Sequence, residues 1–405
     1  MDRTILHCDL NCFYASVELL RLPRLRKLPV AVCGDPASRH GIILAKNELA
    51  KGFGVKTAET VWQAKKKCPS LVLVPPHHDR YREYSEKVNA IYLRFTDLVE
   101  PFGIDESWLD VTGSLHLFGG DAVALADRIR ETVGRELGLT LSVGVSFNKV
   151  FAKLGSDYKK PDATTRIGRD NWRDIVHPLP VETLLFVGRA ARAALGQYGI
   201  RTIGQLAAAD RDFLCDRLGK LGGQLHDYAN GLDRSPVRPW HQKEPVKSVG
   251  NGTTFSQNLT TVDQVRAGTA LLCDSVAMRL RRQGLCCGGV QVTVKDPQFR
   301  VISRQKQLPR PTHLMKELQQ AAMELILSAW RPPSPIRLIT VTAIHLTEEG
   351  ETYCQTDLFA DPEAERQQQR QEKLEQAMDA IRGRFGKDAI AFGAAGEAKG
   401  RGDLP

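Results

Sequence analysis

The sequence lacks the cysteine spacings that build a zinc site or a redox centre. Its nine cysteines are an odd number, are scattered, and include no C-x-x-C pair. Free thiols indicate a reducing compartment, so we expect a cytoplasmic protein. No basic segment followed by an apolar core opens the chain, and no apolar run approaches the roughly 18 residues of a membrane span. The sequence therefore predicts a protein without disulfides and without a membrane anchor.

Extremes of composition are also missing. An apolar fraction of 42% and a charged fraction of 25% exclude collagen-like, coiled-coil and wholly disordered chains. The length of 405 residues predicts several domains, since one domain commonly takes roughly 100 to 200. The net charge of +9 indicates a polyanionic partner without identifying it.

The positive charge is concentrated in one part of the chain. Residues 243–347 carry 14 Lys and Arg against 6 Asp and Glu, whereas residues 348–405 carry 8 against 13. A solvated positive face would have the same composition as a surface that binds a polyanion. We favour the binding surface because a net charge of +8 is concentrated in this one segment.

The first part of the chain has the order of elements of a ferredoxin-like α+β domain. Apolar alternation predicts strands, and apolar residues at helical spacing predict helices. The order is strand, helix, two strands, helix, strand, with an insert at residues 11–75. The expected elements are a strand at 4–9, a helix at 81–98, two strands within 101–111, a helix at 121–137 and a strand at 139–146.

The rest of the chain changes character twice. Short helices separated by glycines occupy residues 166–240 and suit backbone contacts to phosphates. After a Pro-bearing linker, alternating strands at 290–294 and 338–344 predict a second α+β domain. From residue 348 the chain is polar, and its end has a disordered composition. An apolar stripe at helical spacing there is expected to pack against the protein's own surface; it consists of Leu374, Met378, Ile381 and Phe385.

Three carboxylates are the strongest chemical feature. Asp9 ends the first strand, and Asp105 and Glu106 stand at the turn between the two strands of the hairpin. If these points meet at one end of the sheet, the carboxylates repel one another unless divalent cations neutralise them. Oxygen ligands favour Mg²⁺ or Mn²⁺ over zinc, and two such ions about 4 Å apart would suit nucleotidyl transfer. The alternative is that these acids merely terminate strands.

Four motifs resemble those of Y-family DNA polymerases of the DinB type, in the order and spacing of that family. They are Asp9-Leu10-Asn11-Cys12-Phe13-Tyr14-Ala15-Ser16-Val17-Glu18, Ile104-Asp105-Glu106-Ser107-Trp108-Leu109-Asp110-Val111, Ser142-Val143-Gly144-Val145-Ser146-Phe147-Asn148-Lys149 and Ala152-Lys153-Leu154-Gly155-Ser156-Asp157-Tyr158-Lys159-Lys160-Pro161. The resemblance implies an α+β multidomain fold with a ferredoxin-like palm, small fingers, a helix-hairpin-helix thumb and an α+β little finger. The implied boundaries are palm 1–10 and 76–165, fingers 11–75, thumb 166–235, linker 236–245, little finger 246–347 and a tail 348–405.

The resemblance also implies roles for individual residues. Asp9 and Asp105 match the metal-binding aspartates, Glu106 matches the catalytic glutamate, and the carbonyl of Leu10 is a further metal ligand. Tyr14 matches the steric gate, whose ring excludes the 2′-hydroxyl of a ribonucleotide by a clash. Taken alone, Tyr14 would be interpreted as a core aromatic residue of the first helix.

The nucleotide contacts depart from the family pattern. The resemblance implies that Phe13, Lys51 and Lys160 contact the nucleotide, although a Lys before Pro is by itself usually solvated surface. The family commonly has Thr-Ala-Asn-Tyr-x-Ala-Arg before Phe-Gly-Val, and this chain has Ala45-Lys46-Asn47-Glu48-Leu49-Ala50-Lys51. A lysine supplies charge but no planar, bidentate grip. Lys46 is an alternative phosphate contact, and an inward-pointing Glu48 would repel phosphate.

Three further segments fit the resemblance. Val187-Gly188-Arg189 resembles the hairpin of a helix-hairpin-helix, with a plain helical turn as the alternative. Lys247-Ser248-Val249-Gly250 resembles the start of the little finger, which would bind DNA phosphates in a salt-sensitive way. In the tail, Gln355, Leu358 and Phe359 of the segment 355–359 resemble the motif that binds the β subunit sliding clamp, with a plain linker as the alternative.

The sequence thus predicts a low-fidelity translesion DNA polymerase, a monomer that works in DNA repair without a proofreading exonuclease. Its implied partners are primer-template DNA, deoxynucleoside triphosphates and the clamp, and its implied cofactors are two Mg²⁺, or Mn²⁺, per active site. One alternative is a catalytically silent adaptor that binds DNA and the clamp. Another is a nucleotide cyclase, which the basic second domain argues against.

Overall fold

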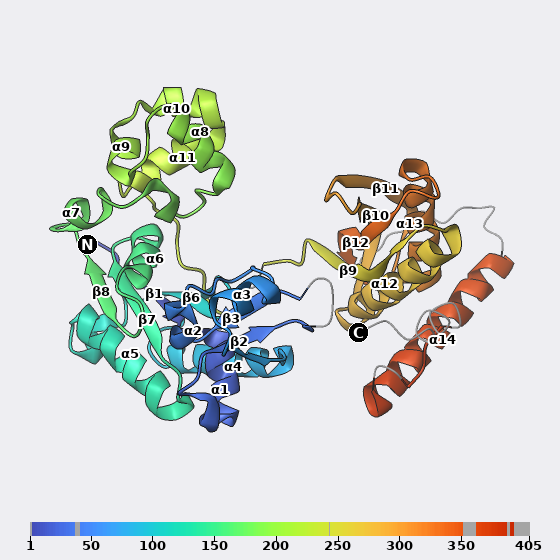
Figure 1. Cartoon of the computed structure of the whole chain (residues 1–405), viewed down its shortest axis with the longest axis horizontal. Coiled ribbons are helices and arrows are strands. Elements are labelled where there is room, and N and C mark those ends of the chain that lie inside the picture. The colour runs from blue at the N-terminus through green and yellow to red at the C-terminus, as the bar shows by residue number, and fades with distance from the viewer. Residues whose placement is uncertain (1, 37–40, 243, 351–361, 387–388, 393–405) are drawn as a thin grey trace. The chain divides into compact units, whose positions relative to one another are not determined.

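The structure, a computed structural model, describes the whole chain except residues 1, 37–40, 243, 351–361, 387–388 and 393–405. The chain forms two compact units, Met1–Lys243 and Glu244–Pro405. Each unit mixes helices with sheet, so the predicted α+β multidomain class is confirmed (Figure 1). The described cysteines are free thiols. Within the described ranges, no helix is both long and apolar enough to cross a membrane.

A five-stranded sheet in the order β5-β6-β1-β7-β8 organises the first unit. The strand β1 lies between β6 and β7 and is antiparallel to both, which is the ferredoxin-like arrangement predicted from the sequence. The last strand, β8, is parallel to β7, and the palm boundary expected at residue 165 falls inside it. The bounds are β1 Ile5–Leu10, β5 Val99–Pro101, β6 Glu106–Asp110, β7 Leu141–Ser146 and β8 Thr164–Ile167.

The central strand β1 is buried on both faces. Because side chains alternate along a strand, Leu6, Cys8 and Leu10 share one face. They join the apolar core formed with the helices α1 (Phe13–Arg21), α4 (His78–Tyr92) and α5 (Ala122–Leu137). The opposite face, with His7 and Asp9, lies against the helix α6 (Lys149–Tyr158). Polar groups of β1 are therefore directed at α6.

A small three-stranded sheet and a group of short helices complete the first unit. Strands in the order β3-β2-β4 pack with two short helices around their own core; the bounds are β2 Val30–Cys33, β3 Ile43–Lys46, β4 Val72–Val74, α2 Glu48–Gly52 and α3 Val61–Lys67. Five short helices surround a further core; they are α7 Trp172–Val176, α8 Arg189–Gln197, α9 Ile203–Ala208, α10 Arg211–Leu218 and α11 Lys220–Ala229. Gly188 is the N-cap of α8, and Phe186 has φ 70°, the left-handed conformation that glycine adopts most easily. Phe186, directly before Val187-Gly188-Arg189, thus has a backbone conformation in which glycine is the usual residue.

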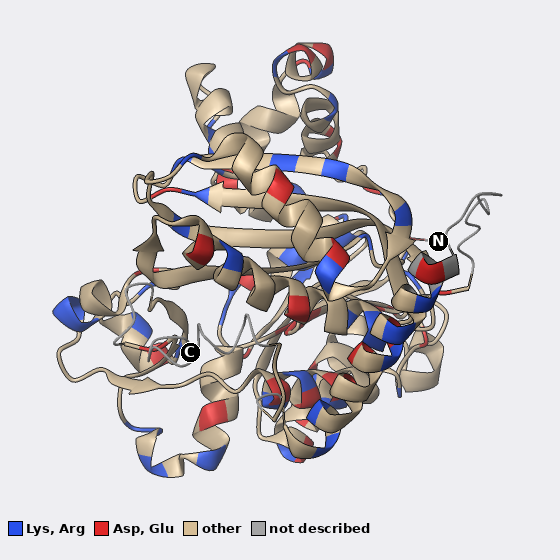
Figure 2. Cartoon of the chain, turned by 90° about the vertical axis from the view of Figure 1, so that its right-hand side faces the viewer, with Lys and Arg blue, Asp and Glu red and all other residues tan. Residues whose placement is uncertain are grey.

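The second unit contains a four-stranded antiparallel sheet, β11-β10-β12-β9, with α12 (Val262–Arg282) and α13 (Met315–Ala329) against one face. Alternate residues such as Val290, Val292 and Val341 join that core, and polar residues such as Thr293 and Thr342 occupy the other face. The bounds are β9 Ser248–Leu259, β10 Leu285–Lys295, β11 Val301–Thr312 and β12 Ile336–Glu348. The edge strand β11 carries basic residues, which Figure 2 colours blue.

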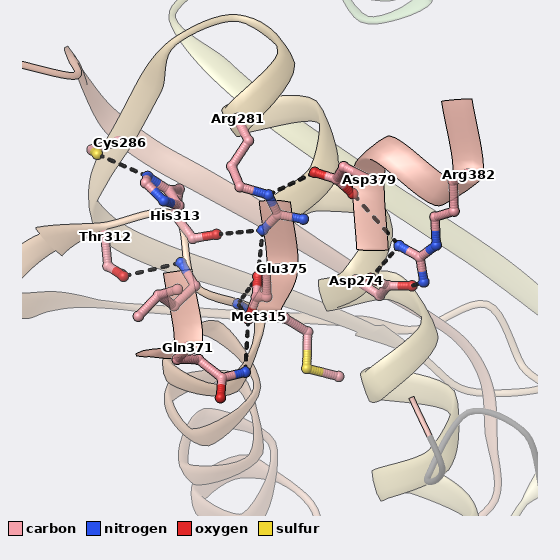
Figure 3. Close-up of polar contacts among 11 residues, drawn as sticks. Asp274, Arg281, Cys286, Thr312, His313, Met315, Gln371, Glu375, Asp379 and Arg382 are labelled. Carbon is pink, nitrogen blue, oxygen red and sulfur yellow. Dashed lines mark hydrogen bonds and ion pairs between the residues drawn. The ribbon is translucent and has the colours of Figure 1, made fainter. Parts of the chain in front are cut away.

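The helix α14 (Pro362–Phe385) packs on the second unit through charged residues (Figure 3). Arg281 of α12 forms ion pairs with Glu375 and Asp379, and the guanidinium of Arg382 donates to both oxygens of Asp274 at 2.9 and 2.8 Å. Glu375 is 0% exposed and Arg382 6%. We call these five residues the α14 network.

The apolar stripe of α14 does not form the contact expected from the sequence. Met378 is buried, but Leu374, Ile381 and Phe385 are exposed, so the predicted packing of the stripe is wrong for three of its four members. The helix is rotated so that charged residues face α12. The carboxylate of Glu375 also accepts from the backbone N–H of Met315, the first residue of α13, which has no side-chain cap of its own.

Candidate active site

The three predicted carboxylates meet at one end of the five-stranded sheet. Asp9 in β1 is the register partner of Glu106 in β6. The backbone N–H of Leu10 donates to the carbonyl of Asp105 at 3.0 Å, which fixes the turn beside the end of β1. The strand pairing therefore brings together residues that lie almost a hundred positions apart in the sequence.

Asp105 and Glu106 differ sharply in their pKa values. Burial, and then the negative charges of Asp9 and Glu106, raise the pKa of Asp105 to about 6. Burial would also raise the pKa of Glu106, but the contact with His7 and the positive charge of Lys153 hold it at about 2. Burial and neighbouring like charges thus make ionisation of Asp105 less favourable than that of Glu106.

Two lysines lie among the carboxylates. The Lys153 ammonium lies 2.7 Å from Glu106 and 3.4 Å from Asp9, and that of Lys160 lies 2.6 Å from Asp9. Both lysines also pair with Asp157, at 3.4 and 2.7 Å. The sequence identified Lys160 but not Lys153, although the i, i+4 spacing of Lys153 and Asp157 places them on one face of α6.

The donor set fits a divalent metal ion. Ligand atoms of His7, Asp9 and Glu106 lie within 4.8 Å of one another. The pKa of Asp105 is raised by burial and then by the charges of Asp9 and Glu106, and a cation would relieve that repulsion. Carboxylate oxygens are the ligands that Mg²⁺ and Mn²⁺ prefer. His7 was not predicted, although the period of two along β1 places it on the same face as Asp9.

Tyr14 lies at the edge of this cluster, near the start of α1. Its ring stacks on Tyr81 of α4 with a centroid distance of 4.0 Å and an interplanar angle of 11°. Partial burial and the charge of Asp105 raise its pKa. The hydroxyl of Tyr81 donates to the buried carboxylate of Glu18 at 2.7 Å. The ring of Tyr14 is thus held against a second ring that is itself anchored, whereas Phe13 is 3% exposed and belongs to the apolar core.

A cavity of about 420 Å³ adjoins the start of α1. Cys12, Arg26, Asn47 and Glu48 are among the residues that line it. The thiol of Cys12 donates to Glu48 at 3.2 Å, and Lys51 pairs with the same carboxylate at 3.4 Å. Glu48 therefore points toward the cavity, the orientation that would repel a phosphate unless Lys51 compensates its charge.

Some of the other residues considered as phosphate or DNA contacts are paired with side chains of the protein itself. Lys46 donates to Thr57 at 3.1 Å. Of the basic residues in the second unit, Lys306 and Arg310 pair with Glu324 and Glu317, and Arg281 belongs to the α14 network. The motif with Gln355, Leu358 and Phe359 lies outside the described residues.

Comparison with known proteins agrees with this fold and site. The impB/mucB/samB family matches residues 8–157, and the C-terminal domain of that family matches residues 246–358. The chain is 46% identical to a DNA polymerase IV of Acetivibrio thermocellus, over 97% of each chain. It is 36% identical to DNA polymerase IV 1 of Bacillus subtilis, over 97% of this chain and 93% of that one.

The solved structure of a Y-family DNA polymerase chimera has the same fold. Its TM-score is 0.75 at 21% identity, and the match covers 85% of this chain and 99% of the chimera. Fold and site together define a Y-family polymerase. The chain belongs to the impB/mucB/samB family, as a member of the DinB type, which confirms the resemblance predicted from the four motifs.

Proposed function

We propose that the protein is a template-directed DNA polymerase of the low-fidelity translesion class. It adds deoxynucleotides to a primer 3′-hydroxyl and releases pyrophosphate, without proofreading. The observation that carries this proposal is the convergence of Asp9, Asp105 and Glu106 beside the stacked ring of Tyr14. The relatives named DNA polymerase IV, matched along nearly the whole chain, support it.

Each residue of the carboxylate cluster has a role in this proposal. Two Mg²⁺ ions, or Mn²⁺, would make the primer hydroxyl a better nucleophile and stabilise the leaving pyrophosphate. Asp9, Asp105, Glu106 and the carbonyl of Leu10 would hold the ions, and Glu106 would lie nearest to the attacking hydroxyl. Lys153 and Lys160, which pair with these carboxylates in the structure, would then be available to triphosphate oxygens.

Tyr14 is the steric gate for the sugar. Its stacking on Tyr81 leaves the ring little freedom to move aside for a 2′-hydroxyl. Tyr14→Ala should therefore raise ribonucleotide incorporation at least about 100-fold relative to deoxynucleotide incorporation, measured as a ratio of kcat/KM values. Tyr198→Ala, an exposed tyrosine of the first unit, is the matched control. Unchanged sugar selectivity in Tyr14→Ala would remove the gate assignment.

The remaining nucleotide contacts are Phe13 and Lys51. Phe13 supports the start of α1 from the core, directly after Cys12, which lines the cavity. Lys51 replaces the family's arginine, and its pairing with Glu48 keeps the ammonium beside the cavity. The triphosphate is thus held by single lysine charges in place of a planar guanidinium.

The subdomain roles follow the same proposal. Residues 1–10 and 76–165 are the palm, 11–75 the fingers, 166–235 the thumb, 236–245 the linker and 246–347 the little finger. The polar face of the second unit's sheet and the turn at Gly188 would contact the DNA backbone. The tail 348–405 would reach the β subunit clamp through Gln355, Leu358 and Phe359, which raises the local concentration of a monomeric, cytoplasmic enzyme on DNA.

Primer extension tests the proposal directly. With Mg²⁺, a primer-template and four deoxynucleotides, the wild-type protein should extend the primer, and deletion of 355–359 should spare this activity while removing stimulation by the clamp. If the wild-type protein binds DNA and the clamp but extends no primer, the adaptor alternative is correct. No observation favours that alternative, since the three carboxylates that a silent relative would not need are present.

A further inference from the structure

His7 occupies a buried position between two polar groups of the catalytic region. It is 0% exposed and lies in β1 across from Trp108 of β6 and Gly144 of β7. Its Nδ1 lies 2.8 Å from the hydroxyl of Ser156, and its Nε2 lies 3.2 Å from Oε2 of Glu106. One imidazole ring thus connects α6 to the carboxylate proposed to lie nearest the primer hydroxyl.

The Ser156 hydroxyl lies 2.8 Å from both the carbonyl of Lys153 and Nδ1 of His7, and its one hydrogen can be donated to either. When it is donated to Nδ1, the neutral ring of His7 carries its own hydrogen on Nε2. Nε2 then presents a donor to the carboxylate of Glu106, whose Oε2 lies 3.2 Å away.

The close approach of α6 makes this arrangement possible. Gly144 lies under α6, where an added Cβ would overlap the carbonyl oxygen of Ala152. Gly155 faces Gly144, and its Cβ would come within 2.9 Å of the Cα of Gly144. Because both positions are glycines, α6 lies close enough to the sheet for Ser156, the residue after Gly155, to reach His7. The edge of the ring also packs on Trp108 at a centroid distance of 5.4 Å, which prevents it from swinging away.

We propose that His7 is a positioning residue that holds the carboxylate of Glu106 in the orientation required for nucleotidyl transfer. Lys153 pairs with the same oxygen of Glu106, but it also pairs with Asp9 and Asp157 and can change partner when cations bind. His7 is fixed by Ser156 and Trp108 and keeps its position. This inference rests on the proposed role of Glu106 and goes beyond it, since His7 touches neither primer nor nucleotide.

Single-turnover nucleotide insertion distinguishes positioning from a merely structural role. His7→Leu removes the polar contact at similar volume, whereas His7→Gln keeps an amide group that can reach Glu106. We expect the maximal insertion rate of His7→Leu to fall about 10- to 100-fold, with nucleotide affinity within about twofold of wild type. His7→Gln should recover most of the rate.

A matched control is His313→Leu, which replaces another buried histidine, in the second unit beside Cys286. It should leave the insertion rate unchanged. A readout without catalysis is the ¹⁵N chemical shift of His7 Nε2, which should move in Glu106→Gln while that of Nδ1 stays.

Four outcomes would overturn the inference. They are an insertion rate of His7→Leu within about twofold of wild type, equal rate losses in the Leu and Gln variants, an Nε2 shift unaffected by Glu106→Gln, and a wild-type protein that extends no primer. The last outcome alone also defeats the proposed function.

Discussion

The protein contains two charge clusters in which two aspartates and one glutamate meet two basic side chains, and the clusters differ in how these charges are balanced. The catalytic cluster combines Asp9, Asp105 and Glu106 with two lysines, and the α14 network combines Asp274, Glu375 and Asp379 with two arginines. In the first, burial and then the neighbouring charges of Asp9 and Glu106 raise the pKa of Asp105 to about 6. In the second, each carboxylate has a guanidinium partner.

The difference lies in the basic residues. Arginine holds carboxylates in a planar, bidentate geometry, and the network uses it to fix one register of α14 on α12. Lysine presents a single flexible charge, which can leave a carboxylate when a divalent cation arrives. Acidic and basic side chains thus make a fixed contact in the second unit, and in the first unit they form the cluster at which metal ions are proposed to bind.

The largest expected effect on stability comes from breaking the α14 network on one side. Arg382→Leu leaves the partly buried carboxylate of Asp274 without its guanidinium partner, and it should lower the free energy of unfolding of the second unit by about 3 kcal/mol. Chemical denaturation followed by circular dichroism measures this loss. The double variant Asp274→Leu, Arg382→Leu removes both charges and should regain more than half of it. A single variant as stable as wild type would show that the pair does not hold α14.

A smaller effect, a rise in the free energy of unfolding as the pH falls, is expected at the proposed catalytic cluster. The pKa of Asp105 is about 6 in the folded protein and 3.8 ordinarily, so the folded state takes up this proton first as the pH falls. Linkage then makes Asp105 contribute about 1 kcal/mol of added stability between pH 7 and pH 5 in metal-free protein. Unfolding at pH 7, 6 and 5 with a chelator should show this rise relative to Asp105→Asn. A difference between the two proteins that does not change with pH would contradict the raised pKa.

The smallest effect is expected on the outer flank of α14. Phe385 is 75% exposed, so Phe385→Ser should change the free energy of unfolding by no more than about 0.5 kcal/mol. Met378→Ser, on the buried face of the same helix, is the matched comparison and should cost several times more. Equal losses would mean that the apolar stripe packs as the sequence pattern predicted.

The sequence predicted the catalytic cluster better than the α14 network. Asp9, Asp105 and Glu106 stand at strand ends, where alternation and motif spacing place them together. His7 and Lys153 were missed because their contacts depend on how closely α6 approaches β7 at Gly144, a tertiary distance that no local pattern contains. The contacts of the α14 network were missed for a different reason.

For α14, the apolar spacing of Leu374, Ile381 and Phe385 pointed to the wrong face. Partners on α12, about a hundred residues earlier in the chain, decided which face of the helix is buried. Hydrophobic periodicity detects a helix, but a buried contact made by charged residues gives no such signal.

In the proposed function, the cluster of Asp9, Asp105 and Glu106 binds metal ions at some cost in stability. Asp105→Asn tests this when primer extension with Mg²⁺ and the free energy of unfolding in metal-free protein at pH 7 are measured on the same preparation. Extension should fall about a thousandfold or more, with stability equal to or above that of wild type. Extension at the wild-type rate, or a loss of extension accompanied by unfolding, would show that the cluster does not have this role.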